Sequence, residues 1–458
     1  MNIAIFTDNY FPNINGVSSS IYTLTNGLIA KGHKVYIFSI SEPSKKIKLV
    51  ETDPPVFRVP SVSVAFVKPY RAVKPYYIGV IELCRKLNID IIHSQTEFSM
   101  GIMGHLVAKA LGIAQIHTYH TMLEDYTHYL TRGVKVVDKP AKIAAKMLSG
   151  SFCESANSLI VPTEKVKQSI ISYGVNMTTY VIPSGINLKP FSTSEIDITR
   201  LNDIKKEWNI LPSDRVILSI GRVAPEKSID MIIRKMPEIL SLNPNILFIV
   251  IGDGPAMPEL KALAEDLKLG DRIRFPGFVP YSEVATYYHV GDAFISCSTS
   301  ETQGLTYYEA LAAGLPVIAR YDDSISAVLK DDFNSKVFKN PDLLPEIVND
   351  LFESEEKYNR IASNAVKSVE DFDADVFADK VELAYMETIN RYNKRHADRD
   401  ATTIHHIKYK AVDNIEHTWT VAYKGTNKII KPLIRKTHNS KRKLTKIYND
   451  TINKLLEL

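Results

Sequence analysis

Short apolar runs alternate with longer segments of helical spacing from the first residues of the chain onward. Residues 2–6 and 35–40 are apolar runs of strand length. Residues 17–31 lie between them, carry aliphatic side chains at helical spacing, and are followed by Gly32, which favours a left-handed helix cap. A strand, a helix and a second strand in this order indicate a βαβ unit and therefore a parallel sheet.

The alternation recurs in two groups, separated by a turn at residues 183–185 and a polar linker that begins at residues 192–194. The further strands we expect are residues 90–93, 114–119, 158–161 and 180–182 in the first group and residues 216–220, 246–251, 273–275, 293–296 and 316–319 in the second. Strands of the second group end in glycine-bearing loops, and ligands of open α/β sheets bind outside such carboxyl ends. The pattern predicts an α/β fold with two Rossmann-like domains facing across a cleft.

We expect a first domain over residues 1–188, a second over residues 189–370, a crossover helix over residues 371–390 and a basic amphipathic extension over residues 391–458. The extension holds 16 Lys/Arg against 6 Asp/Glu, so it carries +10 and leaves −6 on the rest of a chain whose formal net charge is +4. A basic tail on an acidic body favours an anionic partner surface, either a membrane or a nucleic acid. A solubilising tail without a partner is the alternative.

The three cysteines, Cys84, Cys153 and Cys297, form no Cys-x-x-Cys pair, and their odd number argues against a disulfide framework. We expect buried thiols in a reducing cytoplasm. The N-terminus lacks the basic region of a signal peptide, and no run of about 18 apolar residues predicts a transmembrane helix.

The most informative string is residues 300–311, which holds Glu301 and Glu309 across a loop that leads from a strand into a helix. Gly304 permits a tight backbone turn beside a ligand, and the helix N-terminus at Leu305 would offer amides to a phosphate. Carboxylates accept hydrogen bonds from sugar hydroxyls, so the two glutamates would hold two parts of one elongated ligand. Two exposed surface glutamates are the alternative.

A second string, residues 221–227, places Arg222 and Lys227 in one strand-to-helix loop. A diphosphate suits such a pair, since arginine makes bidentate contacts and lysine supplies a point charge. The alternative is a solvated loop with a surface pair between Glu226 and Lys227.

With these strings in place, the chain resembles the family 4 retaining glycosyltransferases of the GT-B fold. The matching strings, which follow the family's order over about residues 1–390, are residues 16–17, 119–121, 183–186 and 221–227 and the Glu301/Glu309 pair. The resemblance implies a nucleotide-sugar donor held mainly by the second domain, with Arg222 and Lys227 on its diphosphate. It further implies Glu309 on the ribose, Glu301 on the sugar, and Gly16 where the backbone approaches the donor phosphates.

His120 matches the family's histidine near the sugar, where an imidazole would bond to a hydroxyl or to developing charge. The resemblance thus implies His120 and Glu301 as the catalytic residues; His117 is better explained as a core histidine. Two strings depart from the family: Ser184 stands where asparagine is usual, and Gln303 stands where phenylalanine is usual. The second change lies beside the sugar and leaves the sugar's identity open.

We expect no tightly bound cofactor and no metal site, with a uridine-type sugar nucleotide as substrate and Mg²⁺ at most stimulating overall activity. The acidic strings at residues 371–373 and 373–375 stand at a helix start, where capping is the better explanation. Gly252-x-Gly254 is not a dinucleotide fingerprint, because Pro255 follows and no third glycine is placed correctly.

For the acceptor, residues 121–129 resemble the diacylglycerol glucosyltransferases of the family, which make glycolipid membrane anchors in Gram-positive bacteria. A helix expected to start near Asp138 and Pro140 carries Lys139, Lys142 and Lys146 beside an apolar stripe. Such a helix would lie on an anionic membrane. An ordinary surface helix that packs its apolar stripe on its own domain is the alternative.

The resemblance implies transfer of glucose from a UDP-sugar to diacylglycerol with retention, and the basic segments predict an enzyme peripheral to the inner face of the cell membrane and without a nucleic-acid partner. The alternatives are the same chemistry on a polyprenyl-linked or polysaccharide acceptor, a nicotinamide oxidoreductase, and a non-catalytic membrane-binding protein. The missing dinucleotide fingerprint counts against the oxidoreductase, and the complete set of donor-binding residues counts against a protein that has lost catalysis.

Overall fold

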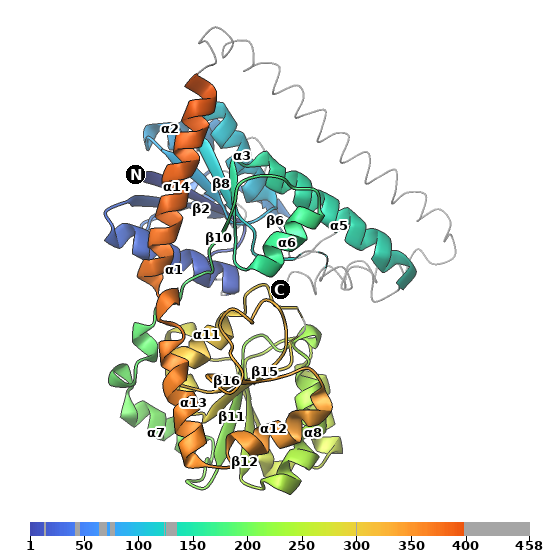
Figure 1. Ribbon diagram of the computed structural model, residues 1–458. Coiled ribbons are helices and arrows are strands. Elements are labelled where there is room, and N and C mark those ends of the chain that lie inside the picture. The colour runs from blue at the N-terminus through green and yellow to red at the C-terminus, as the bar shows by residue number, and fades with distance from the viewer. Residues whose placement is uncertain are drawn as a thin grey trace.

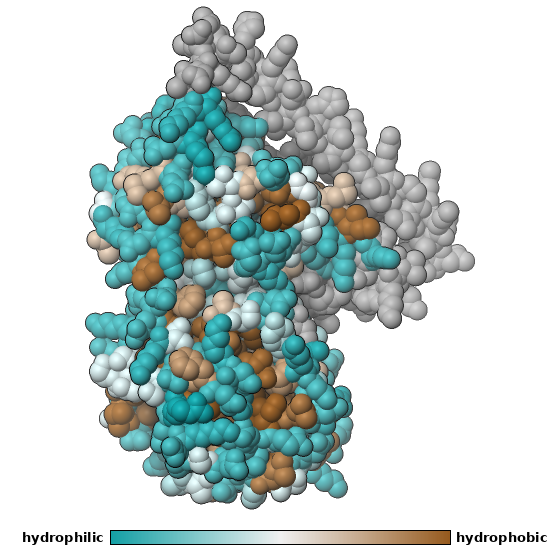
Figure 2. All heavy atoms as spheres, viewed as in Figure 1, coloured by the Kyte–Doolittle hydropathy of each residue, from teal (hydrophilic) through white to brown (hydrophobic). Residues whose placement is uncertain are grey.

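Two parallel-sheet domains follow one another along the chain and meet at a narrow waist (Figures 1 and 2). The computed structural model describes residues 1–12, 15–41, 46–63, 71–73, 78–122, 124, 135–298 and 300–397. The expectations that rest on residues 125–129 and on the tail beyond residue 397 lie outside these described residues.

The first domain is built on a sheet whose described strands run in the order β10-β9-β8-β7-β1-β2-β4-β3. All neighbours are parallel except β3 and β4. The strands are β1 (Asn2–Thr7), β2 (Lys34–Ile40), β3 (Lys48–Val50), β4 (Val56–Val59), β7 (Ile91–Ser94), β8 (Ala114–Thr118), β9 (Ser158–Val161) and β10 (Thr179–Val181), with a separate hairpin of β5 (Ser61–Ser63) and β6 (Arg71–Val73).

Helices cover both faces of this sheet, and local signals fix their ends. The helices are α1 (Gly16–Ala30), α2 (Ile78–Lys86), α3 (Ser99–Leu111), α5 (Lys135–Ser155) and α6 (Glu164–Ser172). Asn15 and Ser18 form a reciprocal capping box at the start of α1. Gly32, just beyond the end of α1, has a φ of +82°, as the expected cap requires.

The second domain has a sheet with strand order β13-β12-β11-β14-β15-β16, parallel throughout. The strands are β11 (Arg215–Ile220), β12 (Ile246–Ile251), β13 (Ile273–Gly277), β14 (Ala293–Ser296), β15 (Val317–Arg320) and β16 (Ser335–Phe338). The helices are α7 (Ile198–Glu207), α8 (Ile229–Leu242), α9 (Met257–Asp266), α10 (Val284–Tyr288), α11 (Leu305–Ala312), α12 (Leu344–Leu351) and α13 (Glu355–Lys367). Two parallel sheets with this α/β covering confirm the expected fold class.

The last described helix, α14 (Ala374–Ala397), returns from the second domain and packs beside α1 of the first (Figure 1). Phe377, Val381 and Tyr385 are buried there in the core of the first domain. A methyl group on Gly27 of α1 would lie 2.7 Å from Cβ of Ala378. The two helices therefore approach at a point where only hydrogen fits.

Each expected strand is present within two residues at either end, but several strands were missed. Strands β3 to β6 and β16 are short, and their three- or four-residue runs carry too little periodicity to be recognised. The helix expected to start near Asp138 begins at Lys135 instead. Pro140 lies inside it, where a proline forfeits one backbone hydrogen bond without ending the helix.

We predict that Gly27→Leu destabilises the first domain by about 1–3 kcal/mol, because the side chain would wedge α14 away from α1. Thermal and urea unfolding would measure the change. Asn26→Leu is the matched control, since residue 26 is exposed on the same helix and leucine improves helix propensity at both positions. Equal stability of the two variants would contradict the close packing of α1 on α14.

Candidate active site

Glycines at the ends of β11 and β12 bring two loops into backbone contact. Gly221 has a φ of +137° and Gly252 a φ of +130°, both outside the range that side chains favour. A methyl group on Gly252 would overlap the carbonyl oxygen of Gly221, and one on Gly254 would overlap that of Val223. These glycines shape the loop that presents Arg222, and they do not form a dinucleotide fingerprint.

Arg222 lies two residues beyond the end of β11 and pairs with Glu226 through its Nη2 atom. Its Nη1 atom is buried and has no hydrogen-bond acceptor among the described residues. A buried guanidinium nitrogen without an acceptor is costly, so this geometry indicates an anionic oxygen as the missing partner. The sequence-based prediction placed this residue on a diphosphate.

Lys227 lies at the end of the same loop and contacts the loop that carries Glu301. Its Nζ atom lies 2.6 Å from Oε1 of Glu301, which is almost wholly buried. Burial raises the pKa of Glu301, but the charge and hydrogen bond of Lys227 outweigh it and hold the pKa below the usual value. The residue expected on the diphosphate and the residue expected on the sugar are therefore bonded to each other.

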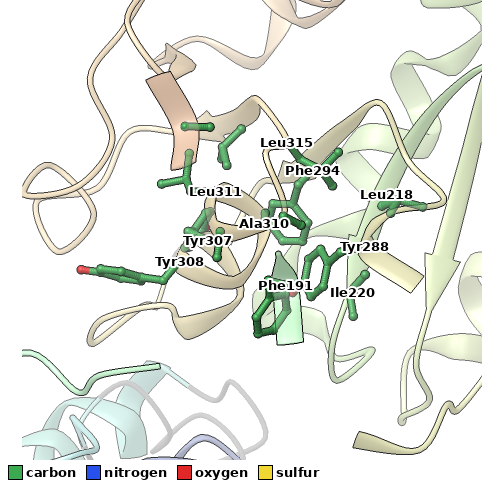
Figure 3. Packing of buried hydrophobic residues seen from close by; sticks show 14 of the residues in the cluster. Phe191, Leu218, Ile220, Tyr288, Phe294, Tyr307, Tyr308, Ala310, Leu311 and Leu315 are labelled. Carbon is green, nitrogen blue, oxygen red and sulfur yellow. The ribbon is translucent and has the colours of Figure 1, made fainter. Parts of the chain in front are cut away.

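Glu309 is buried on α11 and has a different environment from Glu301. Its Oε2 atom accepts a hydrogen bond from the hydroxyl of Tyr288 at 2.8 Å. Burial raises the pKa of Glu309 to about 7, and the tyrosine bond lowers it only in part. Tyr288 packs with Phe191 and Phe294 in the core beside α11 (Figure 3). This packing holds in place the hydroxyl that donates its hydrogen bond to Glu309.

The turn into α11 is set by Gly304, whose φ is +78° and whose added methyl group would overlap the ring of Tyr307. Leu305 is the first residue of α11. A methyl group on Gly221 would lie 3.8 Å from Cγ2 of Thr306, so the loop of Arg222 borders the first turn of α11. The structure thus places the second-domain residues expected to bind a donor around one helix start.

His120 follows β8 in the first domain, where its Nε2 atom lies 2.6 Å from Oε1 of Gln95. The Nε2 atom of Gln95 donates to His93 at 3.1 Å, and His93 in turn contacts the hydroxyl of Tyr385 at 2.6 Å. Burial, with a smaller effect of His117, lowers the pKa of His120 to about 3, so its imidazole is neutral. Because Gln95 presents an acceptor oxygen, Nε2 carries the proton and Nδ1 is left as an acceptor.

Sequence reasoning did not identify Gln95, Tyr288 or Tyr385. A glutamine two residues after a buried strand histidine belongs to no recognisable motif. From the sequence, the two tyrosines are expected to be core residues. His117 is fully buried and bonded to Ser94, as expected for a core histidine.

Gly16 is the first residue of α1, and a methyl group there would meet no atom of the described residues within 4 Å. As far as the described residues reach, the start of this helix leaves room beside the backbone of Gly16. Ser20, one turn further along, donates a hydrogen bond to Ser184 at 2.7 Å. Gly16 thus lies close to the junction of the two domains.

The three lysines expected to contact a membrane lie apart from the residues around α11. Lys139, Lys142 and Lys146 on α5 line an open cavity of about 480 Å³ together with Met122, Glu124, Ile143, Ser169, Ser172 and Tyr173. Met147 and Leu148 have exposed fractions of 67% and 64%, so these two apolar side chains do not pack on their own domain. Figure 2 shows hydrophobic surface where α5 projects from the first domain.

Two findings concern metal ions and membrane spans. Across the described residues, no group of three or more His, Cys, Asp or Glu side chains is arranged to hold a metal ion. Asp373 accepts from the amide of Asp375 at 3.1 Å just before α14, as expected for capping. In the same part of the chain, no helix combines the length and apolarity needed to cross a bilayer.

Comparison with known proteins extends these observations. The family model described as Glycosyltransferase Family 4 matches residues 14–189, and the one described as Glycosyl transferases group 1 matches residues 202–368. The chain is 36% identical to an alpha-monoglucosyldiacylglycerol synthase of Acholeplasma laidlawii, over 86% of this chain and 99% of that protein. It is 34% identical to a synthase of the same name from Streptococcus pneumoniae, over 94% and 96% of the two chains.

Solved structures with a similar fold include HepE from Anabaena in complex with UDP and glucose, with a TM-score of 0.67 and 15% identity over 84% of this chain and all of that one. Sucrose-phosphate synthase from Thermosynechococcus elongatus has a TM-score of 0.66 and 18% identity, over 85% and 99% of the two chains. Together with the two family models and the synthases, they identify the chain as a GT-B enzyme of glycosyltransferase family 4, a nucleotide-sugar-dependent hexosyltransferase.

Proposed function

We propose that the protein transfers glucose from UDP-glucose to diacylglycerol with retention of the α configuration. The name shared by the two relatives that match over most of the chain supports the sugar, the linkage and the lipid acceptor. The observation that carries the donor assignment is the buried Nη1 atom of Arg222, which lacks an acceptor among the described residues and lies in the loop beside α11. The oxygens of a diphosphate would supply that acceptor.

Donor binding would exchange one ion pair for another. In this structure, Lys227 neutralises Glu301. A diphosphate that binds Arg222 and the amides at the start of α11 would compete for Lys227 and free the Glu301 carboxylate. That carboxylate would then accept hydrogen bonds from the glucose hydroxyls, while Glu309 accepts from the ribose. The same cations would stabilise the negative charge of the departing diphosphate.

His120 would act on the transferred sugar as a neutral acceptor. Its Nε2 proton is committed to Gln95, so Nδ1 would accept a hydrogen bond from a glucose hydroxyl and hold the sugar in place. Retention would follow from attack by the acceptor hydroxyl on the face that the diphosphate leaves, through an oxocarbenium-like state. A diphosphate oxygen would take the acceptor's proton.

The acceptor lipid stays in the bilayer, because each exposed methylene costs about 0.8 kcal/mol. The enzyme would therefore bind the cytoplasmic face of an anionic membrane. The exposed Met147 and Leu148 beside the lysines of α5 suit such a surface, with basic groups near lipid phosphates and apolar groups at the acyl boundary. The basic extension beyond residue 397 adds positive charge.

The direct test is glucose transfer from labelled UDP-glucose to diacylglycerol in liposomes, with the product's anomeric configuration read by nuclear magnetic resonance. We expect an α-linked glucolipid, and Arg222→Ala and Lys227→Ala should lower kcat/KM about 10- to 150-fold through loss of charge-assisted hydrogen bonds. A β product would refute retention. Transfer only to a polyprenyl-linked or polysaccharide acceptor would refute the lipid assignment, and near-normal activity of both variants would remove the diphosphate assignment.

We predict that UDP-glucose binds more weakly as the pH falls below 7. The pKa of Glu309 is raised to about 7, so the free protein protonates this carboxyl below that pH, and binding as a carboxylate must release the proton. Affinity should fall up to tenfold per pH unit between pH 7 and pH 6. Titration calorimetry would measure it.

Glu309→Gln is the control for this pH dependence and should bind with an affinity that is flat over the same range. His120 does not titrate there, because its pKa is about 3. The stability of the fold depends on pH in the opposite direction. Because the pKa of Glu309 is higher in the folded chain than its value of 4.5 in the unfolded chain, this group stabilises the fold fully below pH 4.5, and the contribution is lost as the pH rises through 7. A pH dependence that persists in Glu309→Gln would contradict the assignment.

We predict that Met147→Ser with Leu148→Ser weakens sedimentation with phosphatidylcholine vesicles at least tenfold, at low and high salt alike, because apolar insertion is lost. Truncation after Ala397 should weaken binding only to vesicles that contain phosphatidylglycerol, and only at low salt. Leu242→Ser, at an exposed position of the second domain, is the control. Unchanged binding of the double variant would show that α5 does not insert.

A further inference from the structure

The side chain of Gln303 reaches from the second domain to the segment that leaves the first. Its Nε2 atom donates to the carbonyl oxygen of Ser184 at 2.8 Å, and its Oε1 atom accepts from the amide N–H of the same residue at 2.8 Å. The exposed fractions are 4% for Gln303 and 5% for Ser184. One amide thus satisfies both backbone groups of one buried residue.

Ser184 is itself fixed to the first domain and to the returning chain. Its Oγ atom accepts a hydrogen bond from Ser20 of α1. A methyl group on the neighbouring Gly185 would lie 2.6 Å from Cβ of Phe377, and the amide of Ile186 donates to the carbonyl of residue 372 at 3.0 Å. Gln303 therefore bonds to Ser184 beside the two segments, near residues 186 and 372, in which the chain passes between the domains.

The loop that carries Gln303 receives two more contacts from the first domain. The hydroxyl of Thr163 donates to the carbonyl of Thr302 at 3.1 Å, and Nζ of Lys165 lies 3.5 Å from the carbonyl of Glu301. Both of these contacts are partly open to solvent, whereas the bonds of Gln303 are buried. Loss of the two buried bonds of Gln303 would leave the backbone N–H and C=O of Ser184 with neither a protein partner nor contact with water.

We propose that Gln303 is a positioning residue that clasps the first domain at Ser184 and so holds Glu301 in register with His120 and the acceptor. Donor groups are held by the second domain and acceptor groups by the first, so transfer depends on how the two are aligned. A misplacement of about 1 Å costs on the order of 100-fold in rate. Without the clasp, the buried N–H and C=O of Ser184 would lack partners, and opening the domains would hydrate them.

The two bonded residues are also the two departures from the family's usual strings. Phenylalanine at position 303 would offer no polar group to Ser184, so an enzyme with that residue must hold its domains by other contacts. The clasp deepens the proposed function and rests on it for the identity of the reaction.

The test is Gln303→Met in the full chain, which keeps the side chain's length and removes both hydrogen bonds. We expect kcat for glucose transfer to fall about 10- to 100-fold, while the Kd for UDP changes less than threefold, because Arg222, Lys227 and Glu309 remain in place. Small-angle X-ray scattering should show a larger radius of gyration than for the unsubstituted protein. Gln168→Met, at an exposed glutamine of α6, is the matched control and should behave as the unsubstituted protein.

A kcat within twofold of the unsubstituted protein would overturn the proposal. So would a Kd for UDP that rises as much as kcat falls, since Gln303 would then shape only the donor site. If Gln303→Met does not fold, Gln303→Asn, with its amide one methylene shorter, must show the same split. If the unsubstituted protein transfers nothing to diacylglycerol, the proposed function fails, whereas UDP binding and scattering still decide whether the clasp holds the domains.

Discussion

The docking of α14 on the first domain is the constraint on which the site depends. This helix follows the second domain in sequence, yet Phe377, Val381 and Tyr385 complete the core of the first. The chain therefore crosses between the domains twice, and the two crossings are hydrogen-bonded through Ile186. The helix also reaches the site, because Tyr385 contacts His93, which contacts the glutamine that orients His120.

The charged groups around α11 are balanced within the protein. Arg222 pairs with Glu226 and Lys227 with Glu301, while burial raises the pKa of Glu309 toward neutrality. Buried charges without partners would strongly destabilise the fold, so these pairings let the cations stay in a partly buried loop. A diphosphate that takes Lys227 from Glu301 would exchange one ion pair for another, and the freed carboxylate would bond to the hydroxyls of the sugar.

Much of the fold and the second-domain site follows from the sequence, because both depend on local signals. The strands that precede the Arg222 and Glu301 loops are apolar runs, and the glycines that turn those loops are visible in the sequence. The pairing of Lys227 with Glu301 was not predictable, since it joins loops 74 residues apart. The bonds of Gln95 to His120 and of Tyr288 to Glu309 are likewise tertiary contacts that no spacing rule reports.

Ser184 and Gln303, the two departures from the family's usual strings, also form a tertiary contact that the sequence does not report. In the sequence, Ser184 and Gln303 are 119 residues apart, and nothing in either string connects one position with the other. The structure shows one bonded pair, in which the glutamine amide bonds to the serine backbone. A backbone partner leaves no trace in the identity of residue 184, so no inspection of side-chain types would have joined the two positions.

One short segment links His120 to the cavity beside α5. His120 lies two residues after the end of β8, and Met122, two residues later, lines the cavity beside the lysines of α5. Two residues span at most about 7 Å in an extended chain, so the backbone of His120 lies near one residue of the cavity lining. A lipid headgroup at the basic wall of the cavity would lie beside the stretch of backbone that carries His120. If α5 binds the bilayer as proposed, membrane contact and acceptor placement would depend on the same helix, because its lysines line this cavity.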